Sequence, residues 1–143
     1  PASRAGVDIT LFVRGFCCLR PGVPGLSENI RVVSVLGRFL EHSRMFHFGN
    51  GRPDPLDGDW YIGSADWMYR NLNNRVEAAV PVTGRLNRAK LWRIVQIMSA
   101  DRRGSWDLLA DGSYRLRRPD PDAPDDSPQV MGTFETMMRE ARP

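Results

Sequence analysis

Two kinds of apolar segment alternate along this chain, and their order restricts the folds that it can adopt. Segments rich in β-branched and aromatic residues predict strands, whereas apolar residues spaced three or four positions apart predict amphipathic helices. The expected order is a strand at 7–13, a helix at 28–41, strands at 45–48, 60–62 and 76–82, a helix at 86–100, a hairpin at 106–118 and a closing helix at 130–141. This order predicts a layered domain of the α/β or α+β class.

The first predicted helix depends on a capping residue and a periodic pattern. Ser27 is a good N-cap, and Glu28 suits the positive end of the helix dipole. Apolar residues then recur at helical spacing, and they are Val32, Val35, Leu36, Phe39 and Leu40. We therefore expect this helix to end at the polar segment 41–44.

The C-terminal part of the chain shows a hairpin signal and a change in composition. Asp111-Gly112 stands between two apolar segments, which is typical of a tight hairpin turn. Residues 119–128 are acidic and rich in proline, as in a solvated linker. We predict a domain at 1–118, a linker at 119–128, and a closing helix within 129–143 that packs back on the domain.

Charge is distributed unevenly and suggests an anionic partner. Residues 1–118 carry 18 basic and 11 acidic side chains, whereas residues 119–143 carry 2 and 6. A basic body attracts anions. No stretch approaches the roughly 20 apolar residues of a membrane-spanning helix. The chain begins without a methionine or a signal peptide, so we expect it to be a piece of a longer protein.

The two cysteines, Cys17 and Cys18, are adjacent in the sequence. A disulfide between neighbouring residues is strained, and no other ligand stands at a metal-binding spacing from them. We expect both to be buried, reduced thiols.

Side chains suited to phosphate stand near three strand ends. An imidazole can donate a proton or attack phosphorus near neutral pH, and a guanidinium matches the oxygens of a phosphate. A Gly-Ser turn lets the backbone come close and adds a hydroxyl. The residues are Arg14, His42, Arg44, Gly63, Ser64 and Asp66. Because ligands tend to bind where strand ends converge, we predict that Arg14 and His42 face a common anion.

Each of these residues also has a simpler interpretation. His42 can serve as a cation at the C-terminus of the predicted helix, and Arg44 can be an ordinary surface arginine. Asp66 can accept a hydrogen bond from an imidazole or cap the turn after its strand. The other histidine, His47, is predicted to be a half-exposed residue inside a strand.

Several motifs of complete phosphate-handling enzymes are absent. The sequence has no Walker-type glycine-rich loop and no Gly-x-Ser-x-Gly elbow. It has no carboxylate cluster able to hold Mg²⁺ by itself. Since phosphoryl transfer needs strong charge neutralisation, the chain is expected to supply only part of such a site.

Six short segments resemble the last domain of bacterial polyphosphate kinases. They are VRGFCCLRPG (13–22), GLSENI (25–30), GRFLEHSR (37–44), IGSADWM (62–68), RNL (70–72) and RVE (75–77). The resemblance covers residues 7–82 in order and is specific. It is weak from residue 83 onward, where only the apolar pattern guides the interpretation.

The resemblance implies a phospholipase D-like layered α/β domain, with a mixed sheet flanked by helices and a C-terminal hairpin and helix. The phospholipase D signature is His-x-Lys-x4-Asp followed by Gly-Ser. In this chain Arg44 replaces the lysine two residues after His42, and Gly49 replaces the aspartate. The loss of that aspartate argues against phosphodiesterase chemistry.

The resemblance also implies a function and partners. The family transfers the terminal phosphate of ATP to polyphosphate, reversibly, and its phosphorylated histidine and Mg²⁺ contacts lie in the preceding domain. Arg14 and His42 fall on positions that contact ATP phosphates. The hypothesis is that His42 is catalytic, Arg14 and Arg44 bind phosphate, and Ser64 and Asp66 support them. None of these residues is expected to bind a metal, since Mg²⁺ is held mainly outside this chain.

The expected partners are ATP or ADP, polyphosphate, the preceding domains and further copies of the whole protein, but no nucleic acid. The expected location is the cytoplasm or the periphery of the inner membrane. The isolated chain is expected to be inactive.

Two other functions fit the same residues. One is a small phospholipase D-like nuclease that forms a homodimer and cleaves without metal. The other is a non-catalytic module that binds polyanions or mediates oligomerisation.

Overall fold

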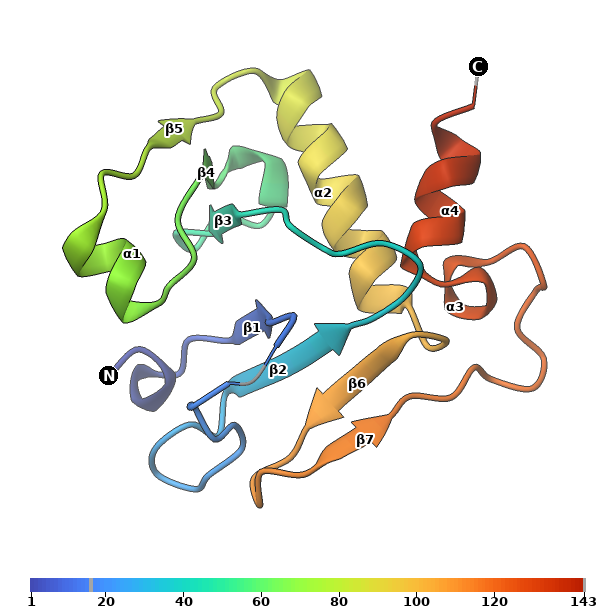
Figure 1. The fold of residues 1–143 in the computed structure, drawn as a ribbon, viewed down its shortest axis with the longest axis horizontal. Coiled ribbons are helices and arrows are strands. Elements are labelled where there is room, and N and C mark those ends of the chain that lie inside the picture. Colours follow the sequence, from blue (N-terminus) through green and yellow to red (C-terminus); the bar gives the residue numbers. More distant parts are fainter. Residues whose placement is uncertain (16, 143) are drawn as a thin grey trace. The chain divides into compact units, whose positions relative to one another are not determined.

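A computed structural model describes residues 1–15 and 17–142, which form two compact units (Figure 1). The first unit comprises Pro1–Glu41 and Ile97–Pro143, and the second comprises His42–Gln96. Each unit contains one sheet, and the described part of the chain therefore has two sheets where the sequence predicted one. The prediction of a layered α/β fold is confirmed. In the part of the chain described, no helix is both long and apolar enough to cross a bilayer.

The sheet of the first unit has four strands in the order β1-β2-β6-β7. These strands are β1 (Ile9–Phe12), β2 (Ile30–Val35), β6 (Ser105–Leu108) and β7 (Tyr114–Leu116). β1 pairs with β2 in parallel, with Ile9 opposite Ile30, and the other pairs are antiparallel. The sheet is therefore mixed. A short 3-10 helix, η1 (Ser3–Ala5), precedes it.

The predicted helix at 28–41 is wrong, because β2 occupies most of that range. Four of its six residues are β-branched, and such side chains lose χ1 freedom in a helix but pack well in a sheet. Residues 32–35 are all buried between β1 and β6, as expected for a central strand. Ser27 caps no helix: its hydroxyl donates to the carbonyl of Arg20 and accepts from the amide of Val23, which closes a loop.

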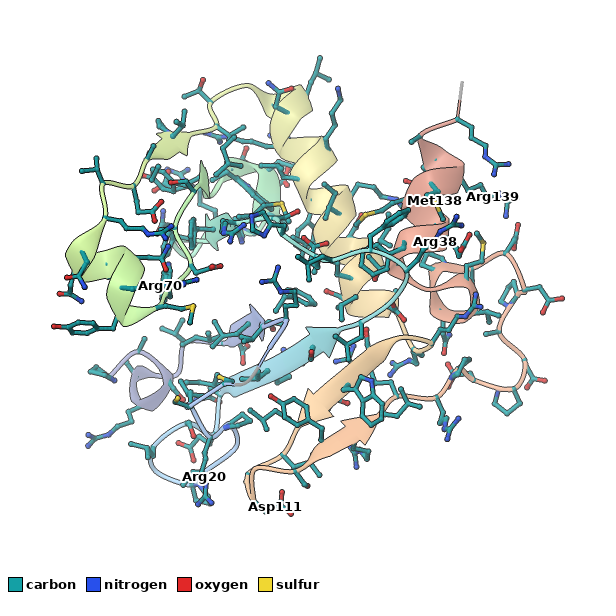
Figure 2. All side chains as sticks on the ribbon, in the orientation of Figure 1. Arg20, Arg38, Arg70, Asp111, Met138 and Arg139 are labelled. Atoms are coloured by element: carbon teal, nitrogen blue, oxygen red, sulfur yellow. The ribbon has the colours of Figure 1, made fainter. Side chains whose placement is uncertain are left out.

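The predicted hairpin is confirmed by the pairing of β6 with β7. Gly112 has φ +89°, a conformation that glycine adopts without strain. The Asp111 carboxylate accepts hydrogen bonds from the hydroxyl and the amide of Ser113, and these bonds lower the pKa of Asp111. Asp111 lies at the tip of this hairpin (Figure 2).

The chain after the hairpin ends in two short helices where the pattern predicted one. Residues 119–127 contain no helix or strand, and α3 (Pro128–Met131) and α4 (Thr133–Glu140) follow. Gly132 separates them with φ +79° and ψ 171°, a region that is essentially reserved for glycine. On α4, Phe134 packs edge-on against Phe39 with ring centroids 5.9 Å apart.

Asp101 is a buried residue of the first unit, only 1% exposed, and its carboxylate accepts four hydrogen bonds. One oxygen accepts from the amide and the hydroxyl of Thr133, both at 2.7 Å. The other accepts from the amides of Arg103 and Gly104, at 2.8 and 2.9 Å. Asp101 thus fastens the start of α4 to the turn that leads into β6.

The second unit contains a three-stranded antiparallel sheet in the order β3-β4-β5. Its strands are β3 (Met45–Phe48), β4 (Asp59–Gly63) and β5 (Ala79–Pro81). Its helical segments are η2 (Pro55–Asp57), α1 (Tyr69–Asn74) and the first three turns of α2 (Arg85–Ala100). Trp60 is 1% exposed and packs against the rings of His47 and Trp92, with centroids 4.4 and 6.4 Å away.

Candidate functional site

The predicted site residues are divided between the two units. Arg14 belongs to the first unit, whereas His42, Arg44, Ser64 and Asp66 belong to the second. The prediction that Arg14 and His42 face a common anion stays a prediction.

In the first unit, Arg14 stands just beyond the end of β1 and borders two hollows. The β1–β2 pairing sets its position, because the amide of Val13 donates to the carbonyl of Val33 and the Ser34 hydroxyl donates to the carbonyl of Arg14. Its guanidinium donates to the carbonyl of Glu41 at 2.5 Å. One hollow, of about 330 Å³, is lined by Arg14, Gly15, Ser34, Leu36, Trp106 and Tyr114. The other, of about 240 Å³, is lined by Arg14 and residues 35–41.

In the second unit, His42 and Arg44 lie in the extended segment that leads into β3. His42 is exposed, and no helix ends at it, so the interpretation as a cation at a helix terminus is wrong. Arg44 is largely shielded, with 12% of its side chain exposed. The amide of Gly63 donates to the carbonyl of Arg44 at 3.0 Å, which holds this segment beside the end of β4.

The guanidinium of Arg44 joins two elements of the second unit. Its Nη1 donates to the carbonyl of His42 at 2.5 Å, and its Nη2 donates to the carboxylate of Asp66 at 2.7 Å. Its Nε is buried and has no partner in the described part of the chain. Arg44 therefore has structural partners and also one unused donor, and Asp66 accepts from Arg44 rather than from an imidazole.

Ser64 is fastened to the segment that precedes β5. Its hydroxyl donates to Glu77 and accepts from the amide of Ala78 at 3.0 Å. Asn71 donates to the other oxygen of Glu77 at 2.8 Å. Glycine at position 63 leaves room for this close approach, because a Cβ there would stand 3.2 Å from the carbonyl oxygen of Ala78 and the neighbouring backbone would have to shift. The hydrogen of the Ser64 hydroxyl is thus engaged in the hydrogen bond to Glu77.

Sequence reasoning assigned no role to Asn71 and Glu77. Both lie in the short segments that carry the family resemblance, 70–72 and 75–77, which was the available signal. Their partner, Ser64, is 13 residues from Glu77 in the sequence, and no local pattern links the two.

Glu77 gives the second unit a component of stability that depends on pH. The hydrogen bonds from Ser64 and Asn71 lower the pKa of Glu77 from its usual value of 4.5. A lowered folded-state pKa stabilises the fold above pH 4.5, and this stabilisation is lost as the pH falls through the folded-state value. We expect Glu77→Gln to lower the unfolding temperature at pH 7 and to have a smaller effect at pH 3. Thermal unfolding at both pH values measures this. The exposed Glu135→Gln is the control, and equal effects of Glu77→Gln at the two pH values would contradict the expectation.

Cys17 and Cys18 are free thiols, but Cys18 is exposed, so the prediction that both are buried is wrong. Cys17 and Cys18 both lie outside the strands and helices. Among the described residues, no three His, Cys, Asp or Glu side chains gather in a way that could hold a metal ion.

The fold defines a class of protein, namely phospholipase D-like α/β domains of the kind found in polyphosphate kinases. The chain is similar to the crystal structure of polyphosphate kinase from Porphyromonas gingivalis, with a TM-score of 0.82 and 34% sequence identity. The match covers 97% of this chain and 20% of that one. A family model described as polyphosphate kinase C-terminal domain 2 matches residues 1–128, and the chain belongs to this family.

Curated relatives of the chain support the same family assignment. The chain is 56% identical over 120 residues to the polyphosphate kinase of Thermosynechococcus vestitus, and 49% identical over 141 residues to that of Streptomyces coelicolor. These matches cover 84% and 99% of this chain. The similarity thus extends well beyond residue 82, where the six segments end. The chain spans 16% and 18% of the length of these two relatives.

Proposed function

We propose that this chain is the C-terminal domain of a polyphosphate kinase, which transfers the terminal phosphate of ATP to polyphosphate and also runs in reverse. The observation that carries the proposal is the family match over residues 1–128, together with relatives of the same name at about half identity. Membership of this family supports the kinase rather than the nuclease or the non-catalytic polyanion-binding module.

The proposed contribution of this chain is a set of phosphate-facing groups. Arg14, which borders two hollows, and Arg44 stabilise negative charge on the transferred phosphoryl group. The exposed imidazole of His42 donates a hydrogen bond to the phosphates and a proton to the leaving oxygen. Each contact of this kind is worth about 2–4 kcal/mol in a transition state. Ser64 and Asp66 support the set through their partners in the second unit.

The remaining parts of the site are proposed to come from outside this chain. Mg²⁺, when bound, neutralises phosphate charge during phosphoryl transfer. The metal is proposed to be held by the preceding domains. The phosphorylated histidine is proposed to lie there too. We accordingly expect the isolated chain to turn over no ATP, and detectable turnover would contradict this.

The partners follow from the same proposal. They are ATP or ADP, polyphosphate, the preceding domains of the polypeptide and further copies of the whole enzyme, and no nucleic acid. A cytoplasmic location, or one at the periphery of the inner membrane, stays a prediction.

Arg14→Ala in the full-length enzyme tests the proposed phosphate contact. Because the guanidinium is expected to bind phosphate, kcat/KM for ATP should fall by about 30-fold or more, which corresponds to at least 2 kcal/mol. Steady-state kinetics of polyphosphate synthesis measures this.

Arg102→Ala is the matched control for this experiment, since Arg102 lies in the same unit away from both hollows. It should leave kcat/KM near the wild-type value. Equal losses in the two variants would favour unspecific polyanion binding and would count against the proposed site.

A further inference from the structure

Arg44 holds the main chain of the proposed catalytic histidine. Its Nη1 donates to the carbonyl of His42, two residues earlier, while its Nη2 is bound to Asp66, 22 residues later. A guanidinium is planar, so two partners on different nitrogens fix its plane. The carbonyl of His42 is thereby attached to the loop that follows β4.

The sheet of the second unit fixes both ends of this connection. Met45 pairs with Ile62 in the β3–β4 ladder, and the amide of Gly63 donates to the carbonyl of Arg44. The positions just before β3 and just after β4 therefore have a defined register. Asp66, three residues beyond Gly63, lies where its carboxylate reaches the guanidinium.

The Arg44–Asp66 pair differs from the other ion pairs described in the same unit. Its side chains are 12% and 34% exposed, whereas Arg85 is 60% exposed and its partners Asp54 and Asp57 are 40% and 50% exposed. Shielding from solvent makes an ion pair less sensitive to salt and more demanding in geometry. The pair is therefore suited to holding a fixed position.

A carboxylate is an unexpected neighbour in a site for phosphate. Asp66 reduces the positive charge that Arg44 offers to an anion, which weakens binding if charge is the only role of Arg44. Correct placement of a catalytic group can outweigh the weaker binding of the anion, because a misplacement of about 1 Å can cost about 100-fold in rate.

We propose that Asp66, by clamping Arg44, is a positioning residue for the main chain of His42, in addition to the phosphate contact proposed for Arg44, and that turnover requires Asp66 although its charge opposes phosphate binding. The proposal rests on the proposed catalytic role of His42. It adds a function for Asp66 and explains why a planar guanidinium, rather than a lysine, stands two residues after this histidine.

The test is Asp66→Asn in the full-length enzyme, with kcat and KM for ATP measured separately. If Asp66 positions His42 through Arg44, kcat should fall about tenfold or more while KM changes less than about threefold. If Arg44 acts by charge alone, removal of the opposing carboxylate should lower KM and leave kcat unchanged. The second result would overturn the proposal.

A double-mutant cycle separates positioning from a general loss of structure. In a His42→Ala background, Asp66→Asn should reduce kcat less than about threefold further, because there is no imidazole left to position. An equal reduction in both backgrounds would reject action through His42. Arg44→Lys keeps the charge but loses the planar guanidinium, and it should reproduce the loss of kcat. Asp66→Glu keeps the carboxylate, so its kcat should lie between those of the wild type and Asp66→Asn.

Two further comparisons complete the test. Asp57→Asn removes a carboxylate from the exposed pair with Arg85 in the same unit and should leave kcat unchanged. His42→Ala alone separates the catalytic role of His42 from the positioning role of Asp66. A large loss with His42→Ala but none with Asp66→Asn rejects only the positioning role. No loss with His42→Ala rejects both the catalytic role of His42 and the positioning that depends on it.

Discussion

Replacement of His42 by alanine in the full-length enzyme is expected to lower kcat for polyphosphate synthesis about 100-fold or more, because it removes a donor to the transferring phosphate and a proton source for the leaving oxygen. His42 is exposed and lies outside the helices and strands, so the fold should be unaffected. Steady-state kinetics in both directions measures the loss. An activity within about tenfold of wild type, or ~1.4 kcal/mol, would reject a direct catalytic role.

The other histidine provides the control for this experiment. His47 packs against Trp60, and its Nε2 lies 3.1 Å from the carbonyl oxygen of Pro55, so its contacts are structural. We expect His47→Ala to lower the unfolding temperature while the folded enzyme keeps its kcat. The opposite effects of the two substitutions would separate catalysis from packing.

The largest expected effect on stability follows from Asp101→Ala in the first unit. This substitution leaves three amides and one hydroxyl without their acceptor in a buried place. Buried donors that lose a partner are costly, and we expect a destabilisation of about 3–5 kcal/mol. Urea unfolding, followed by fluorescence of the tryptophans, measures it.

Asp107→Ala is a suitable comparison, since Asp107 pairs with Arg117 but is 29% exposed on its side chain. Water can replace that partner, so the loss should be about 1 kcal/mol or less. If Asp101→Ala cost no more than Asp107→Ala, the fastening of α4 by Asp101 would be unimportant for the fold.

Local patterns predicted the elements that neighbouring residues determine by themselves. The β6–β7 hairpin follows from the Asp111-Gly112 turn, and β3 and β4 follow from short apolar segments bounded by polar loops. α2 follows from its periodic apolar positions. The pattern failed at β2, where Val32, Val35 and Leu36 fit a helical period. Burial of β-branched side chains between two strands decided the outcome instead.

The same distinction applies to the candidate site. His42, Arg44 and Ser64 were singled out from residue type and short spacing. Asp66 was also singled out, but the pairings were not predicted, because Arg44 meets Asp66 across 22 residues and Ser64 meets Glu77 across 13. Such pairs exist only once the β3–β4–β5 sheet has formed, and no periodic pattern encodes them.

The edge of the small sheet has a practical consequence for the handling of this chain. β5 is an edge strand of the second unit and ends at Pro81, which has no amide hydrogen to offer. A strand from another molecule cannot extend the ladder at that position, and proline at an edge is one means by which proteins avoid aggregation. Pro81 therefore helps to keep concentrated preparations of this domain from forming intermolecular sheets.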